Sequence, residues 1–232
     1  MWSILTCVDT PSYKTMDKAF LFDMDGVLID TERTWGAREN ELLTRVFGSD
    51  VVKKIGNTVG TSITTMYKIA HSHGATIDYE SYKTAYDEAS KPVYAEAAIT
   101  EGVDALAARL RSLGFRLGLV TSSPQNWVDR VLPRLSFSKH LEVVLSLFDH
   151  PTWQPKPAAD GYIEALRRLD ADPSRSFVLE DSETGIRSGK DSGAFVICFT
   201  GNHERNYRPS GADAYANTME DVIRLVESFD GN

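Results

Sequence analysis

The sequence predicts an α/β fold, in which a parallel sheet is flanked by helices and a further block of helices follows the first strand. Short apolar runs alternate with amphipathic helical patterns throughout residues 99 to 229. Each run is followed by polar or turn residues, as at the ends of buried strands. Residues 33 to 97 break this alternation, because they hold helical patterns and no convincing strand. We therefore expect parallel βαβ units with right-handed crossovers and a helical insert.

Five short apolar runs predict the strands of the sheet. The first ends at Asp23 and is followed by a loop signal, Asp25-Gly26. The second is bounded by Gly114 and by the polar stretch that begins at Thr121. The continuous apolar character of the runs predicts strands that are buried on both faces. The runs lie at residues 19–23, 115–120, 143–147, 177–179 and 194–199.

Amphipathic patterns predict the helices that cover the sheet. Val103, Leu106 and Leu110 recur with helical spacing, and Gly114 is placed to cap that helix. Similar patterns occur at 162–169 and at 222–229, the last beginning near Thr218. In the insert, the patterns run over 35–47, 63–73 and 79–94, divided by Gly56, Gly60 and Gly74.

These patterns predict a core with two added parts. Residues 1–17 form a disordered or loosely docked tail, residues 18–32 and 98–232 form the core, and residues 33–97 form a helical cap. The first residues have no basic region followed by an apolar one, so we expect no signal peptide. No stretch approaches the roughly 20 apolar residues that a membrane helix needs.

Composition excludes several classes of partner. A formal net charge of −8 argues against a surface for nucleic acid or an anionic membrane, since both require a concentrated basic face. Cys7 and Cys198 lie far apart, with neither the pattern of a disulfide framework nor the spacing of a zinc site. A reducing cytoplasm is the expected location.

Polar side chains lie where the predicted strands end, and there they can form a site. In open α/β sheets, ligands bind beyond the carboxyl ends of the strands. Lys156 lies in a proline-flanked loop that opens a helix and can reach the same edge. We expect Lys156 to meet the polar residues of the strand ends, which are Asp23, Asp25, Thr121, Ser122, Glu180 and Asp181.

Such an acidic cluster requires a counter-charge, because carboxylates a few ångströms apart repel one another. Oxygen ligands without His or Cys select a hard ion, and Mg²⁺ leaves room for a substrate phosphate. Asp23, Glu180 and Asp181 are the predicted side-chain ligands. The expected partner is a small phosphorylated metabolite.

These residue types permit phosphoryl transfer. Asp23 can attack phosphorus and form an acyl phosphate. Asp25 can protonate the leaving oxygen and then deprotonate the attacking water. Thr121, the amide of Ser122 and Lys156 can stabilise charge on the equatorial oxygens.

Each signal also has a purely structural interpretation. Asp-x-Asp near a turn is often a solvated Asx-turn, and Thr-Ser-Ser-Pro is often a helix N-cap. Lys156 can be a surface lysine, and Glu180-Asp181 a turn at a strand end. The four signals occur together and in order, each at a strand end or a helix start, which favours function.

The motifs resemble those of the haloacid dehalogenase-like hydrolases, most closely the β-phosphoglucomutase-like subgroup with a helical cap. The four segments that carry the resemblance are Phe22-Asp23-Met24-Asp25-Gly26-Val27-Leu28, Val120-Thr121-Ser122-Ser123, Lys156-Pro157, and Leu179-Glu180-Asp181-Ser182. The resemblance implies a Rossmann-like, doubly wound parallel core, Mg²⁺, an aspartyl-phosphate intermediate and a mobile cap. It also implies that the backbone carbonyl of Asp25 ligates the metal.

The resemblance favours a phosphatase over a mutase. Asp25 favours phosphate esters, since family members that dehalogenate lack this aspartate. Similar mutases carry a His at the position of Trp35 and an Arg in a Gly-x-x-Arg segment, where this chain has Gly60-Thr61-Ser62-Ile63. Both groups help to hold a phosphosugar for the return transfer. Net hydrolysis is therefore the expected reaction, with a phosphosugar mutase as the alternative.

Two other classes fit less well. A phospho-accepting signalling module of the receiver type uses similar residues but is smaller and has no helical insert. A partner-binding protein on a retired enzyme fold would not need the intact set of acids and Lys156.

The sequence does not identify the substrate or the oligomeric state, although a monomer is compatible with it. Trp35 can be either a buried packing residue or a substrate contact. His71 and His73 are expected on the surface of the insert. The candidate substrate contacts, chosen by proximity or charge, are Thr31, Glu32, Arg33, Trp35, Arg38 and Lys68.

Overall fold

The computed structural model describes residues 17–56, 61–150, 152–204 and 206–230. Most of the predicted tail, together with Cys7 and Gly60, lies outside these residues. Among the described helices, none combines the length and apolar character needed to span a membrane.

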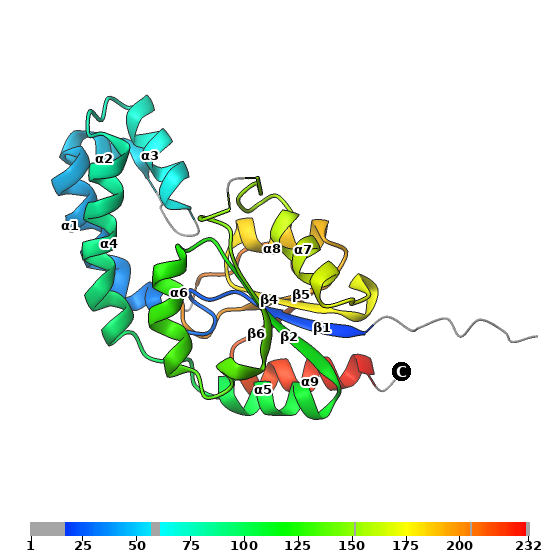
Figure 1. The fold of residues 1–232 in the computed structure, drawn as a ribbon. Coiled ribbons are helices and arrows are strands. Elements are labelled where there is room, and N and C mark those ends of the chain that lie inside the picture. Colours follow the sequence, from blue (N-terminus) through cyan, green and yellow to red (C-terminus); the bar gives the residue numbers. More distant parts are fainter. Residues whose placement is uncertain (1–16, 57–60, 151, 205, 231–232) are drawn as a thin grey trace, which may run out of the picture.

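The core is a six-stranded parallel sheet, which confirms the predicted fold class (Figure 1). Its order is β3-β2-β1-β4-β5-β6, so the chain builds outward from β1 in one direction and then from β4 in the other. The strands are β1 (Lys18–Phe22), β2 (Phe115–Thr121), β3 (Leu141–Ser146), β4 (Phe177–Glu180), β5 (Phe195–Phe199) and β6 (Ala214–Ala216).

The edge strand β6 has no counterpart in the sequence prediction. It contains only three residues, and Tyr215 in its centre pairs with Cys198 of β5. An Ala-Tyr-Ala segment is too short to give an apolar run, so the neighbouring strand rather than local propensity determines its conformation.

Helices cover both faces of the sheet. Helices α5 (Val103–Ser112) and α9 (Met219–Asp230) lie on one face, and α7 (Asp160–Arg168) and α8 (Glu183–Asp191) lie on the other (Figure 1). Helix α6 (Gln125–Val131) follows β2 and packs towards the insert. Short 3-10 turns lie at Leu132–Arg134, Ser138–His140 and Pro173–Arg175.

Neither α6 nor α8 appears in the sequence prediction. Helix α6 is only seven residues long. Helix α8 contains Gly185 and Gly189, which are poor helix formers. A Cβ at Gly189 would lie 2.9 Å from Val196, so this glycine permits close packing of α8 on the sheet. Ser182 caps the helix by accepting a hydrogen bond from the Gly185 amide at 3.0 Å.

The insert contains α1 (Thr31–Phe47), α2 (Ser49–Ile55), α3 (Ile63–Ser72) and α4 (Tyr79–Glu96). Helix α1 begins two residues before the predicted start of the insert, and the short α2 is an additional element between Gly48 and Gly56. The chain leaves and rejoins the core at neighbouring positions. The Asp30 amide donates to the Ala98 carbonyl at 2.9 Å, and the Thr100 amide donates to the Leu28 carbonyl at 3.1 Å.

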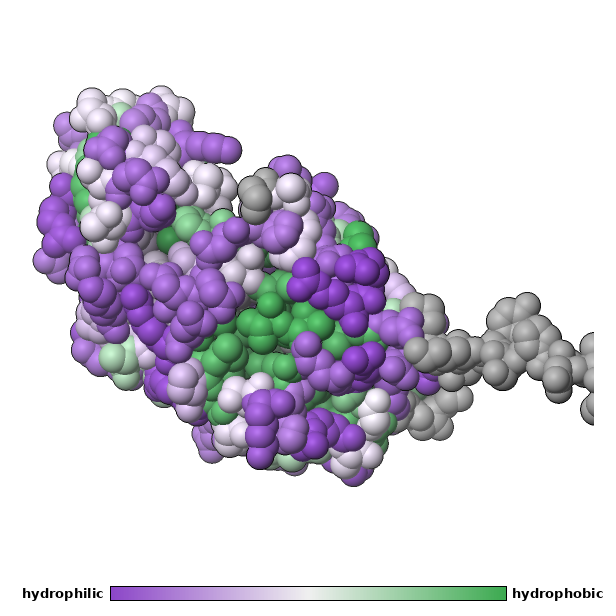
Figure 2. Space-filling model, viewed as in Figure 1, coloured by the Kyte–Doolittle hydropathy of each residue, from purple (hydrophilic) through white to green (hydrophobic). Residues whose placement is uncertain are grey.

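The insert and the core share one apolar cluster, in which aromatic rings form the junction. The Trp35 and Trp127 rings lie 5.8 Å apart, and Tyr94 lies 5.2 Å from Trp127. Polar contacts reinforce the junction, since Arg130 of α6 donates to Asp87 at 2.9 Å and to Ser90 at 2.6 Å. The outer face of the insert is mostly hydrophilic, whereas an apolar area is visible over the middle of the core (Figure 2).

Candidate active site

The register of the sheet brings the predicted residues to one edge. Phe22 pairs with Leu119 of β2 and with Leu179 of β4, so the chain emerges from the three central strands at the same level. Asp23, Thr121 and Glu180 therefore lie side by side at the strand ends, on the side of the core that faces the insert (Figure 1). All three are buried.

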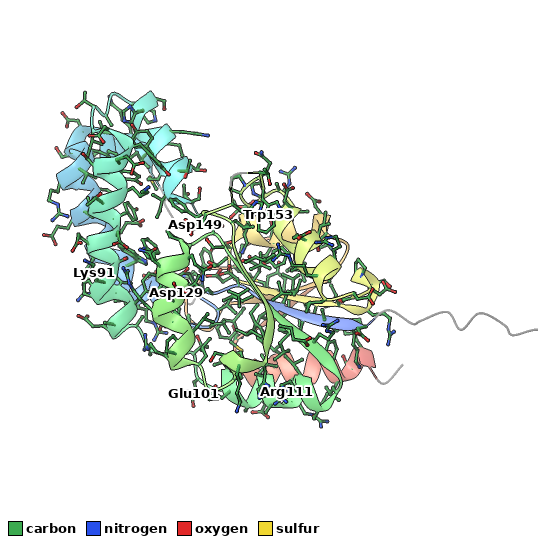
Figure 3. All side chains as sticks on the ribbon, viewed as in Figure 1. Lys91, Glu101, Arg111, Asp129, Asp149 and Trp153 are labelled. Atoms are coloured by element: carbon green, nitrogen blue, oxygen red, sulfur yellow. The ribbon has the colours of Figure 1, made fainter. Side chains whose placement is uncertain are left out.

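Lys156 crosses into this edge from the loop between β3 and α7. Its ammonium group lies 2.5 Å from Asp23 Oδ1 and 2.6 Å from Glu180 Oε1, and it donates to the Val120 carbonyl at 3.1 Å. Its side chain is 5% exposed. Burial alone would lower the pKa of Lys156, but the two carboxylates outweigh it and raise this pKa. The same loop carries Asp149 and Trp153, which are labelled in Figure 3.

One ammonium group does not balance the surrounding acids. Burial raises the pKa of Asp23 well above its ordinary value, Lys156 opposes this effect, and the carboxylates of Glu180 and Asp181 add to it. Asp23, Glu180 and Asp181 each offer a carboxylate oxygen within 4.8 Å of the others. A divalent cation would relieve this repulsion, and the all-oxygen donor set fits Mg²⁺.

Two glycines make room for the acidic cluster. A Cβ at Gly26, whose φ is 74°, would lie 1.8 Å from Asp181 Oδ2. A Cβ at Gly185 would lie 2.0 Å from the Glu180 carboxylate. Any side chain at either position would therefore displace a carboxylate from the cluster.

The three carboxylates differ in the hydrogen bonds that they already accept. Glu180 Oε1 accepts from Lys156 and from the Tyr162 hydroxyl at 2.7 Å. Glu180 Oε2 accepts from the Asp181 amide at 3.1 Å and from the Ser182 amide and hydroxyl at 3.4 and 3.2 Å. Five donors thus surround Glu180, and a metal would have to displace one of them to bind this side chain directly. Asp23 Oδ1 accepts from Lys156, and Asp181 Oδ2 contacts His203.

His203 contacts Asp181 from the loop after β5. Its Nε2 lies 2.7 Å from Asp181 Oδ2, and its ring stacks on Tyr207 with centroids 4.1 Å apart. A histidine in this position orients the carboxylate. No sequence pattern pointed to His203, since it lies 22 positions after Asp181 and no motif includes it.

Two hydroxyl groups hold Asp25, one from the core and one from the insert. Ser123 donates to Oδ2 at 2.6 Å, and the buried Tyr94 of α4 donates to Oδ1 at 2.7 Å. Burial raises the pKa of Asp25, and the bonds from Ser123 and Tyr94 oppose that rise. The sequence analysis did not identify Tyr94.

These residues line one cavity of about 240 Å³ between the core and the insert. The three predicted phosphate ligands, Thr121, Ser122 and Lys156, all line this cavity. Its lining from the core comprises Asp23, Asp25, Thr121, Ser122, Ser123, Trp127, Lys156, Asp181, Ser182 and Thr184. Its lining from the insert comprises Thr31, Trp35, Gly36, Glu39, Thr61, Ser62, Ile63, Tyr86 and Tyr94.

The candidate substrate contacts divide into two groups. Thr31 and the half-buried Trp35 line the cavity. Arg33 is 69% exposed beside Asp30, Arg38 pairs with Glu96 at 2.6 Å, and Lys68 is exposed, so these three do not contribute to the described lining. The side chain of Glu32 lies outside the described part of the chain.

The two histidines of the insert are exposed, as predicted. His71 Nε2 lies 2.8 Å from the Ile77 carbonyl within the insert, so this histidine has a local structural contact.

Comparison with known proteins identifies the family. The family model described as "Haloacid dehalogenase-like hydrolase" matches residues 20–199, which span most of the chain. This chain belongs to the haloacid dehalogenase-like hydrolases. A relative in this family is the validoxylamine A 7'-phosphate phosphatase of Streptomyces hygroscopicus subsp. limoneus, which is 28% identical over 82% of this chain and 88% of its own length.

Two solved structures share the fold. One, from Thermotoga maritima and provisionally named a β-phosphoglucomutase, has a TM-score of 0.66 and 24% identity over 91% of this chain and 99% of that one. The other is CbbY from Rhodobacter sphaeroides in complex with xylulose-(1,5)bisphosphate, with a TM-score of 0.69 and 25% identity over 88% of this chain and 95% of that one.

Proposed function

We propose that this chain is a Mg²⁺-dependent phosphatase that hydrolyses a small phosphorylated metabolite through an aspartyl-phosphate intermediate. The observation that carries this proposal is the buried group of Asp23, Glu180 and Asp181 with Lys156 among them, in the cavity that also contains Asp25. A family relative that acts, by its name, on a phosphorylated small molecule supports the same class of reaction.

Asp23, Asp181 and the backbone carbonyl of Asp25 would hold Mg²⁺, with Glu180 beside them. When bound, the ion supplies positive charge that lets an anionic nucleophile approach an anionic phosphate. His203 and the five donors around Glu180 keep the carboxylates in position.

The residues of the chain divide the reaction between them. Asp23 attacks phosphorus and forms an acyl phosphate while the bond to the leaving oxygen breaks. Asp25 donates its proton to that oxygen and then accepts a proton from the water that attacks the acyl phosphate. This water releases inorganic phosphate and restores Asp23. Thr121, the amide of Ser122 and Lys156 stabilise charge on the equatorial oxygens.

The insert acts as a cap in this proposal, with residues 33–97 as the cap and 18–32 and 98–232 as the core. It covers the site, excludes water and contacts the leaving group. The net charge of −8 and the small cavity favour a small metabolite over a nucleic acid. A reducing cytoplasm suits a chain whose two cysteines lie far apart in sequence.

Mutase chemistry is the weaker alternative. A mutase must hold a bisphosphorylated sugar until the second phosphate transfer. It therefore requires positively charged side chains that bind both ends of this intermediate. Trp35 and Ile63 line the cavity where similar mutases have a His and an Arg.

The first experiment measures phosphate release from an aryl phosphate and from a panel of sugar monophosphates. We expect turnover with Mg²⁺, none in EDTA, recovery when Mg²⁺ is added, and poor support by Ca²⁺, whose looser coordination misplaces the nucleophile. Full activity in EDTA, or no turnover of any phosphomonoester, would contradict the proposal.

The second experiment separates a phosphatase from a mutase. With β-glucose 1-phosphate and a trace of the 1,6-bisphosphate, we expect free phosphate and little glucose 6-phosphate. Efficient formation of glucose 6-phosphate without phosphate release would identify a mutase.

A further inference from the structure

The insert end of the cavity differs in charge from the end where the phosphate would bind. Thr31, Trp35 and Glu39 follow one another at intervals of four residues on α1, so they share one face of that helix. All three line the cavity, while Arg33 on another face is exposed. Helix α1 therefore contributes an indole and a carboxylate to the cavity wall.

Tyr86 holds the Glu39 carboxylate in place. The Tyr86 hydroxyl donates to Glu39 Oε1 at 2.6 Å, and the Tyr86 side chain is buried. Burial raises the pKa of Tyr86 well above its ordinary value, and the Glu39 carboxylate adds to this effect. The phenol therefore remains a hydrogen-bond donor at neutral pH. It fixes a negative charge in the wall of the cavity.

Further aromatic rings lie beside Tyr86, the residue that holds this carboxylate. The Trp35 ring lies 5.6 Å from Tyr86 and 5.8 Å from Trp127, and all three side chains line the cavity. Rings of this kind offer flat apolar faces against which the C–H face of a saturated ring can pack. A carboxylate beside them accepts hydrogen bonds from hydroxyl or ammonium groups.

The described lining contains one basic residue, Lys156, and it lies at the core end beside Asp23. A second phosphate on the leaving group would thus approach Glu39 without a described basic side chain in the lining to offset the repulsion. The charge at the insert end is therefore opposite in sign to what a bisphosphate requires.

We infer that Glu39, held by Tyr86 and flanked by Trp35, selects a phosphomonoester whose leaving group is a single hydroxyl-bearing ring, uncharged or amine-bearing, and rejects a second anionic group. The inference rests on the proposed phosphatase function and makes it narrower. It distinguishes this chain from CbbY, whose solved complex contains a bisphosphate.

The test compares three sugars that differ in the charge distant from the reacting phosphate: glucosamine 6-phosphate, glucose 6-phosphate and glucose 1,6-bisphosphate. We expect the wild type to favour both monophosphates over the bisphosphate in kcat/KM by about tenfold or more. Glu39→Gln keeps an acceptor for Tyr86 but removes the charge, so it should bring this ratio close to one. Glu39→Lys should reverse the preference.

The control is Glu41→Gln, which removes the same charge from an exposed position on the same helix and should leave the ratio unchanged. Affinities for the three sugars are also measured by calorimetry in the Asp23→Asn variant, where no turnover is needed. The inference would be overturned if the wild type showed equal kcat/KM for the bisphosphate and the monophosphates. It would also be overturned if Glu39→Gln left the ratio of these kcat/KM values unchanged. Absence of turnover would refute the phosphatase proposal, while the affinity ratios would still decide the role of Glu39.

Discussion

The core and the insert contribute different chemistry to the same cavity. The core supplies buried charge, namely the carboxylates of Asp23 and Asp181 and the ammonium of Lys156. The insert supplies aromatic surface from Trp35 and Tyr86, with one carboxylate. Charged groups at the ends of rigid strands suit phosphoryl transfer, the step that is common to all phosphate esters. The side chains of a helical layer can differ between proteins to suit different leaving groups. Substitutions in the two parts should therefore affect different quantities.

The largest expected effect is that of Asp23→Asn in the core. The amide cannot attack phosphorus, so we expect kcat to fall by at least about 10⁴-fold for every substrate. Circular dichroism and the melting temperature should show an intact fold. Near-normal activity would remove Asp23 as the nucleophile and with it the proposed division of roles.

Lys156→Met should impair both catalysis and stability. It leaves two buried acids without their counter-charge, and we expect a loss of about 3–5 kcal/mol in the free energy of unfolding without Mg²⁺. Activity should fall about 10²-fold or more, measured by phosphate release. The control is Lys190→Met, which breaks a more exposed pair with Asp213 and should cost at most about 1 kcal/mol. Equal losses in the two variants would contradict the central position of Lys156.

Tyr94→Phe tests the contact by which the insert reaches into the chemistry of the core. Without the hydroxyl, Asp25 loses one of its close donors and retains the one from Ser123. We expect kcat for sugar phosphates to fall about tenfold, because a sugar alkoxide needs protonation as it leaves. The leaving group of an aryl phosphate with an acidic phenol needs less protonation, so kcat for that substrate should change little.

The control for this variant is Tyr67→Phe, which removes another hydroxyl of the insert, one that bonds to the Ile77 carbonyl. It should leave both rates unchanged. Equal slowing of sugar and aryl substrates by Tyr94→Phe would show that Tyr94 does not act through Asp25.

The smallest expected effect comes from Arg130→Met at the junction of the two parts. Arg130 and Asp87 are partly exposed, and the loss of their contact should lower global stability by no more than about 1 kcal/mol. Hydrogen exchange should quicken in α4 while the central strands remain protected. Arg224→Met, which removes comparable pairs on α9, should leave exchange in α4 unchanged.

Strong local patterns allowed much of this architecture to be predicted. The strands β1 to β5 come from apolar runs bounded by turn residues, and the polar residues that follow them meet because parallel strands end at one edge. The elements that escaped prediction are those without such a pattern. Helix α8 carries two glycines for close packing, and β6 depends on its neighbour for its conformation.

The residues that the sequence analysis missed at the site share a different property. His203, Tyr94 and Glu39 act through contacts between segments that are distant along the chain. Their spacing from the motifs is arbitrary, because only the fold brings them together. Charge was likewise a poor guide to the lining, since Arg33 pairs with Asp30 and Arg38 pairs with Glu96 outside the described lining, while the uncharged Thr31 lines the cavity.

The chain crosses between the two parts at neighbouring positions, where Asp30 bonds to Ala98 and Thr100 bonds to Leu28. A segment with adjacent ends can be exchanged for another of different length without moving the strands that bear the nucleophile, since the gap to be closed in the core stays the same. This geometry makes the molecule modular. A transplanted insert from a relative should bring its own preference for the leaving group, while the acids of the recipient core continue to transfer the phosphate.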